Sequence, residues 1–98
     1  MEYWDNSNKI LIENQEKLRK SVIVQYIKYR KKNNMTQEDV AELMGVRRPN
    51  ISRFESGQYN PTLDMLIRMA HCLGAELEIT LKEKEEIRKG DKEHEKEQ

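Results

Sequence analysis

The sequence has few of the residues that build disulfides, metal sites or membrane spans. Its single cysteine, Cys72, cannot form an internal disulfide, and with His71 and His94 it gives too few and too badly spaced ligands for a closed zinc site. No apolar run approaches the roughly 20 residues that cross a bilayer, and residues 1–5 lack the features of a signal peptide. We therefore expect one small cytoplasmic domain with no metal and no membrane partner.

Groups for catalysis are also scarce. The two histidines lie far apart in the sequence, and no Ser/His/Asp or paired-carboxylate spacing is present. No glycine-rich loop is present to hold a nucleotide phosphate. The sequence therefore predicts a protein that is not an enzyme and needs no cofactor.

The charges balance overall but are unevenly distributed. The 98 residues contain 18 basic and 18 acidic side chains, yet residues 17–34 hold seven bases and no acid. Further along, Arg47, Arg48 and Arg53 fall within seven residues. A local basic face is expected on this neutral molecule, because phosphates respond to charges within a Debye length of about 8 to 10 Å.

The first predicted element is a helix over about residues 7–34. This stretch contains neither glycine nor proline, and its apolar residues recur at spacings of one, three, four and seven. The pattern fits either one long helix or two helices joined near Lys17. The pair Asn33-Asn34 suits its end, since asparagine tolerates the left-handed backbone of a helix C-terminus.

Three shorter helices are predicted after it. Thr36 and Asp39 have the spacing of a capping box, so a second helix is expected to start at Thr36 and to end at Gly45. A third helix fits residues 48–56, and Thr62 can cap a fourth that runs to about residue 73.

Two features predict contacts between subunits. The fourth helix carries a second apolar stripe, rich in methionine, which fits either a subunit interface or the core of one chain. Apolar and polar residues then alternate over residues 75–82, which favours a β-strand over a helix. A lone strand lacks a ladder partner, so we expect it to pair with the same strand of a second copy. The residues expected at this interface are Leu77, Ile79, Leu81, Met65 and Met69.

Two short helices joined by a glycine turn match the helix-turn-helix unit, whose second helix enters the major groove of DNA. Here that helix would bury Ile51 and Phe54 and project a polar face on its opposite side. Arginine can bond guanine through two parallel hydrogen bonds, and asparagine can do the same with adenine. The groups predicted on this polar face are Arg47, Arg48, Asn50, Ser52 and Arg53.

The sequence resembles the Cro and phage-repressor class of helix-turn-helix proteins, the XRE family. The resemblance rests on MTQEDVAELMGV (35–46), NISRFESG (50–57), NPTLDML (60–66) and AHCLG (70–74), and covers about residues 18–74. It implies an all-α, lambda-repressor-like fold of four to five helices, to which the alternating segment adds a short C-terminal β-strand. The expected organisation is a helical extension (1–17), the helix-turn-helix domain (18–74), a dimerisation strand (75–82) and a charged tail (83–98).

The resemblance also implies roles for single residues. Arg48 and Arg53 occupy base-reading positions, and Asn50 lies between them on the groove side. Arg30 and Glu55 are implied to form a structural ion pair between the first and third helices. Candidate base contacts are Arg48, Asn50, Arg53 and Arg47. Candidate contacts to the DNA backbone are Gln37, Thr36, Ser52, Ser56, Gln58, Tyr59 and Asn60.

Two departures from the family pattern stand out. Many relatives have Ser or Thr where this chain has Arg47, so the usual cap of the recognition helix is missing and the arginine either weakens that helix or adds a DNA contact. The alternating segment replaces the fifth helix of phage repressors and looks more like HigA-type and HipB-type antitoxins.

We expect a homodimeric transcriptional regulator, most simply a repressor, that reads a pseudo-palindromic operator in double-stranded DNA. The alternative is an antitoxin that neutralises a toxin and represses its own operon. Its docking element would be Trp4 with the N-terminal helix, or the charged tail. For Trp4 and Tyr3, folding against the first helix is the competing interpretation.

Overall fold

The structure, a computed structural model, describes residues 2–84, with side chains from Asn8 onward. In this range four helices and no strand follow in the order α1 (Glu2–Lys32), α2 (Gln37–Met44), α3 (Arg48–Glu55) and α4 (Leu63–Cys72). The all-α prediction is therefore confirmed for the described residues. The side chains of Tyr3 and Trp4, and the charged tail from residue 85 onward, lie outside this description. None of the four helices is long and apolar enough to cross a membrane.

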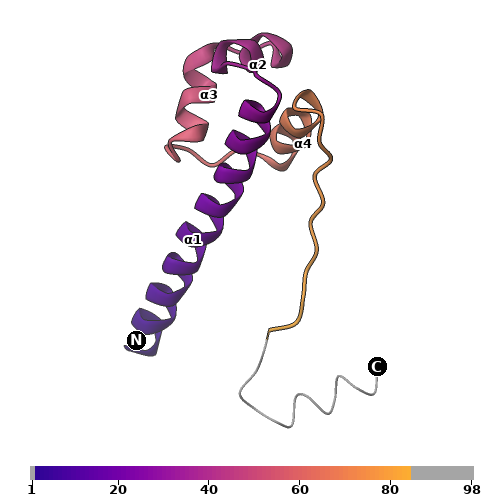
Figure 1. Ribbon diagram of the computed structural model, residues 1–98. Coiled ribbons are helices and arrows are strands. Elements are labelled where there is room, and N and C mark those ends of the chain that lie inside the picture. The colour runs from indigo at the N-terminus through magenta and orange to yellow at the C-terminus, as the bar shows by residue number, and fades with distance from the viewer. Residues whose placement is uncertain (1, 85–98) are drawn as a thin grey trace.

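α1 is one continuous helix of 31 residues, about 46 Å long at a rise of 1.5 Å per residue. The alternative of two helices joined near Lys17 is wrong. Its C-terminal part buries Ile23 and Tyr26, whereas every side chain from residue 8 to residue 18 is exposed. Figure 1 shows this N-terminal part extending away from the other helices. We call residues 8–18 the arm.

The core lies where α2, α3 and α4 meet the C-terminal half of α1 (Figure 1). Tyr26 and Phe54 pack edge to face at its centre, with 5.4 Å between ring centroids, and the Tyr26 hydroxyl donates to the Leu66 carbonyl oxygen at 2.8 Å. All four helices contribute, so α2 and α3 have a fixed geometry relative to α1. The buried residues are Ile23, Tyr26, Val40, Ala41, Met44, Ile51, Phe54, Met69, Ala70 and Leu73.

The methionines of α4 lie in different surroundings. Met69 is only 2% exposed and belongs to the core, so for this residue the structure favours core packing over a subunit interface. Met65 is half-buried and packs against the edge of the core.

Residues 75–84 form neither strand nor helix. The β-strand predicted over residues 75–82 is therefore not confirmed, and the helical alternative is wrong. A strand is defined by its ladder of backbone hydrogen bonds, and the part of the chain that the structure describes gives this segment no partner strand. The segment instead runs away from α4 as an extended trace (Figure 1). Leu77 is half-buried at its start, while Ile79 and Leu81 are exposed.

Candidate nucleic-acid interface

α2 begins with the predicted capping box. Thr36 has an extended backbone, its Oγ1 accepts from the Asp39 backbone N–H at 3.0 Å, and its own N–H donates to Asp39 Oδ2 at 2.8 Å. The helix buries Val40, Ala41 and Met44. Because Thr36 uses both its hydroxyl and its backbone N–H inside the cap, this terminus offers an anion the positive end of the α2 dipole.

A tight turn joins α2 to α3. Gly45 has a φ of 71°, which side-chain-bearing residues rarely adopt, and its N–H donates to the carbonyl oxygens of Ala41 and Glu42. Arg47 takes the N-cap position of α3 with an extended backbone but makes no side-chain cap bond. Pro49 in the first turn of α3 compensates in part, since its fixed φ suits a helix start.

α3 has one buried and one exposed face. Ile51 and Phe54 are 0% and 1% exposed, respectively, and hold the helix against the core. Arg47, Arg48 and Arg53 are exposed, and the predicted neighbours Asn50 and Ser52 are half-buried. The structure thus brings all five predicted groove-side residues onto one short, well-anchored helix and the residue before it.

Gln37, at the first position of α2, lies between two charged side chains. Its Nε2 donates to Glu55 Oε1 at 2.9 Å, and its Oε1 accepts from Arg48 Nη1 at 2.9 Å. From the sequence, Gln37 is expected only to contact a phosphate. The bridge to Arg48 and Glu55 joins positions 11 and 18 residues away, which helical periodicity alone cannot indicate.

Arg30 and Glu55 form the ion pair that the resemblance implies. Arg30 Nε donates to Glu55 Oε2 at 2.6 Å and Arg30 Nη2 donates to Glu55 Oε1 at 3.0 Å, which makes the pair bidentate. Arg30 Nη1 also donates to the Met35 carbonyl oxygen at 2.8 Å. This arginine of the basic stretch therefore ties α1 to α3 and to the start of α2, and its donors face inward.

At the other end of α3, Arg53 Nη2 donates to Asn50 Oδ1 at 2.6 Å. The Ser56 hydroxyl donates to the Arg53 carbonyl oxygen at 3.2 Å, so it serves as a local cap at the end of α3. Gln58 and Asn60 are exposed in the loop that follows. These positions form a continuous polar edge from α3 into the loop before α4.

Tyr59 in this loop is half-buried and faces the core. Its ring lies 6.5 Å from that of Phe54, and its hydroxyl donates to Met65 Sδ at 3.2 Å. Burial raises the pKa of Tyr59, and the nearby positive charge of Arg53 partly opposes that shift. The side chain thus stabilises the loop that carries Gln58 and Asn60.

Two structural polar contacts were not predicted. Arg68 Nη2 donates to the Met44 carbonyl oxygen at 2.6 Å and so caps the end of α2 from α4. Asn33 Nδ2 donates to the Leu73 carbonyl oxygen at 2.7 Å and ties the end of α1 to the end of α4. The unsatisfied carbonyls at helix ends indicate that such partners are needed, but they do not indicate which residues supply them.

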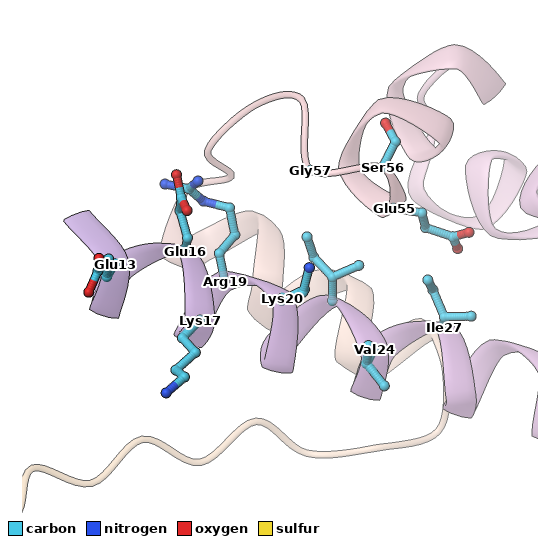
Figure 2. Close-up of a pocket in the computed structure, with 11 residues that line it drawn as sticks. Glu13, Glu16, Lys17, Arg19, Lys20, Val24, Ile27, Glu55, Ser56 and Gly57 are labelled. Carbon is cyan, nitrogen blue, oxygen red and sulfur yellow. The ribbon is translucent and has the colours of Figure 1, made fainter.

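The arm borders clefts on two sides of α1. One cleft, of about 590 Å³, lies between α1 and the end of α3, with Val24 and Ile27 on the α1 side and Ser56 and Gly57 opposite (Figure 2). Its charged rim consists of Glu13, Glu16, Lys17, Arg19, Lys20 and Glu55. The other cleft, of about 380 Å³, has an apolar lining that includes Leu18, Val22, Phe54, Pro61 and Leu66.

Comparison with known proteins gives relatives of two kinds. An uncharacterized HTH-type transcriptional regulator of Archaeoglobus fulgidus is 42% identical over 60 residues, which is 60% of this chain and 84% of the relative. Antitoxin HigA1 of Mycobacterium tuberculosis is 39% identical over 77 residues, which is 79% of this chain and 51% of HigA1. The chain thus spans about half the length of HigA1.

A solved structure described as a toxin-antitoxin module from Streptococcus pneumoniae has a similar fold. It gives a TM-score of 0.59 at 25% identity, over 82% of this chain and 92% of that one. The family model described as helix-turn-helix matches residues 27–79, which contain all of α2, α3 and α4. This match spans more than half of the sequence, and the chain belongs to the XRE-type helix-turn-helix family.

Proposed function

We propose that this protein is a sequence-specific transcriptional repressor that binds a pseudo-palindromic operator as a homodimer. The observation that carries the proposal is the arginine-bearing face of α3, which lies opposite a fully buried face and next to the N-terminus of α2. Arg48 and Arg53 are the proposed readers of guanine in the major groove, with Asn50 and Arg47 beside them. Two such helices would enter successive major grooves about 34 Å apart.

The proposed contacts to the DNA backbone surround this face. Gln37 and Thr36 lie at the N-terminus of α2, where the helix dipole favours a phosphate. Further along α3 and the loop after it, the proposed contacts are Ser52, Ser56, Gln58 and Asn60. Tyr59, whose hydroxyl donates to Met65 Sδ, is proposed to hold the loop in place for them. These contacts would fix the position of α3 in the groove and carry no sequence information of their own.

The proposed dimer forms through residues 75–82. This segment has no strand partner within residues 2–84, and Ile79 and Leu81 expose apolar surface along it. Pairing with the same segment of a second copy across a two-fold axis would complete a strand ladder and cover this apolar surface. Leu77 and Met65 are proposed to complete the interface.

The test is selection of bound sites from a randomised duplex library by the full-length protein at physiological salt. An inverted repeat with half-sites about one helical turn apart is expected. Arg48→Ala is expected to weaken binding to that site by about 1 to 3 kcal/mol and to reduce the base preference at one position. Gln58→Ala, which removes an exposed side chain proposed to contact the DNA backbone, is the control and should weaken all sequences alike. Equal losses on specific and random DNA for Arg48→Ala would refute its base-reading role.

A second candidate function is that of an antitoxin. The similarity to HigA1 extends over 77 residues and so beyond the region of the family model. The arm is the proposed docking surface for the toxin, because Ile10, Leu11 and Leu18 are each more than half exposed on a helix that extends beyond the core. A cleft with a charged rim on one side of α1 and a largely apolar cleft on the other suit a protein partner better than DNA. Trp4 is proposed to extend this surface.

This function can be separated from DNA binding by crossed variants. The product of the reading frame next to the gene, co-expressed with this chain, should lose its toxicity. Leu11→Glu with Leu18→Glu is expected to abolish protection and leave operator binding intact. Arg48→Ala is the matched control, and it should weaken operator binding and leave protection intact. A neighbouring product that is harmless alone, or protection that survives the arm variant, would count against the antitoxin proposal.

A further inference from the structure

The amide of Gln37 has only one orientation that satisfies both of its neighbours. A carboxylate can only accept hydrogen bonds, and a guanidinium can only donate them. The Nε2 of Gln37 must therefore face Glu55, at 2.9 Å from Oε1, which leaves its Oε1 to face Arg48, at 2.9 Å from Nη1. The charge on Glu55 thus sets the direction of a hydrogen-bond chain that ends on α3's first arginine.

Glu55 is itself held firmly. Both of its oxygens accept from Arg30, at 2.6 and 3.0 Å, and its side chain is only 10% exposed. The chain of contacts therefore runs from Arg30 on α1 through Glu55 on α3 and Gln37 on α2 to Arg48. Each link joins two different helices, so the position of Arg48 depends on the packing of all three.

The chemistry of the last acceptor matters. The amide oxygen of Gln37 takes one of the five N–H donors of Arg48 and carries no charge. The guanidinium consequently keeps its full positive charge and enough donors for a bidentate bond to guanine O6 and N7. A carboxylate at position 37 would orient Arg48 too, but would neutralise it.

We propose that Glu55, acting through Gln37, is a positioning residue for the base specificity of Arg48. This inference rests on the proposed DNA-binding function and assigns Gln37 a role in discrimination in addition to any phosphate contact. A phosphate contact alone weakens binding to all sequences alike, whereas a positioning contact changes the preference at the one base pair that Arg48 reads.

The test compares base preference at that position in the selected operator. Gln37→Met keeps the length of the side chain and removes both hydrogen bonds. If a correctly placed arginine discriminates by about 5-fold to 150-fold, Gln37→Met is expected to reduce that ratio by at least about threefold. In an Arg48→Ala background the same change should leave the residual preference unaltered. Glu42→Met, at an exposed position of the same helix, is the matched control and should keep the wild-type preference.

Other outcomes are equally decisive. A uniform loss of affinity in Gln37→Met with unchanged preference would overturn the proposal and leave Gln37 a phosphate contact. A wild-type protein that selects no base at all would refute the proposed function as well. Glu55→Gln removes the charge that orients the Gln37 amide, and it should weaken the preference at the same base pair. Because it also leaves Arg30 without a carboxylate, its melting is measured in parallel, and Gln37→Met decides the case if this variant does not fold.

Discussion

Replacing Glu55 by methionine, with Arg30 left in place, is expected to destabilise the protein more than replacing both residues. The Arg30 and Glu55 side chains are 13% and 10% exposed. In the single variant the guanidinium stays largely out of water with the Met35 carbonyl, 2.8 Å away, as its remaining partner. In Arg30→Met/Glu55→Met both charges are gone, and two apolar side chains of similar length occupy the same space.

The expected magnitudes follow from this burial. Removing one partner of a buried ion pair costs about 3 to 5 kcal/mol, whereas replacing both by apolar residues is often close to neutral. About a tenth of each side chain still contacts water, so we assign about 3 kcal/mol, the lower end of that range, to Glu55→Met. The double variant still loses the bonds to Met35 and Gln37, about 1 kcal/mol together. At about 4 to 8 °C per kcal/mol, the Tm falls by about 12 to 24 °C for the single and 4 to 8 °C for the double variant.

Urea unfolding followed by circular dichroism gives the free energy of unfolding for the wild type, both single variants and the double variant. The coupling energy of this cycle is expected to be about 2 kcal/mol or more. Glu42→Met, a similar change at an exposed position, should stay within about 0.5 kcal/mol of wild type. A double variant as unstable as Glu55→Met would refute the reasoning, because Arg30 would then incur no penalty for losing its partner.

Three further predictions concern other parts of the fold. Arg47→Ser supplies the missing cap of α3, so the unfolding free energy should rise by about 0.5 to 1 kcal/mol in urea melts, while a fall in operator affinity would identify Arg47 as a DNA contact. Ile79→Lys should convert a dimer into a monomer in sedimentation, and an unchanged dimer would exclude that interface. Burial raises the pKa of Tyr26 above its ordinary value of 10.0, so stability should be complete below pH 10 and fall as the pH rises through the folded-state pKa. Tyr26→Phe should reduce this alkaline loss to the part that the raised pKa of Tyr59 contributes, as measured by unfolding at a series of pH values; an undiminished loss would assign it to another group.

The sequence predicts the helix-turn-helix well because its signals are local. A capping box needs only Thr36 and Asp39, three residues apart, and both of its hydrogen bonds are present. Gly45 ends α2 with the positive φ that the turn requires, and Thr62 caps α4 by accepting from the Met65 N–H. Such features depend on neighbours along the chain, so periodicity and residue type are enough to find them.

Other features depend on what the segment meets in space. Residues 75–82 alternate as a strand does, but a ladder needs a second strand, and residues 2–84 contain none. The apolar stripe of α4 likewise does not show whether the core or a second subunit covers it. The structure places Met69 in the core of one chain. The position of Gln37 at a helix N-terminus predicts a phosphate contact. The orientation of its amide depends on Glu55, 18 residues further along the chain.

The arginines show how structure and function separate within one residue type. Arg30 donates to a carboxylate that cancels its charge, and Arg68 donates to the Met44 carbonyl at the end of α2, where its charge compensates the helix dipole. Arg48 and Arg53 donate instead to neutral amide oxygens, which orient a guanidinium without neutralising it. Composition cannot make this distinction, because all four residues count equally toward a net charge of zero. The hydrogen-bond acceptor of each arginine makes the distinction. By this criterion Arg48 and Arg53, both on α3, are oriented and keep their charge for a phosphate-rich partner.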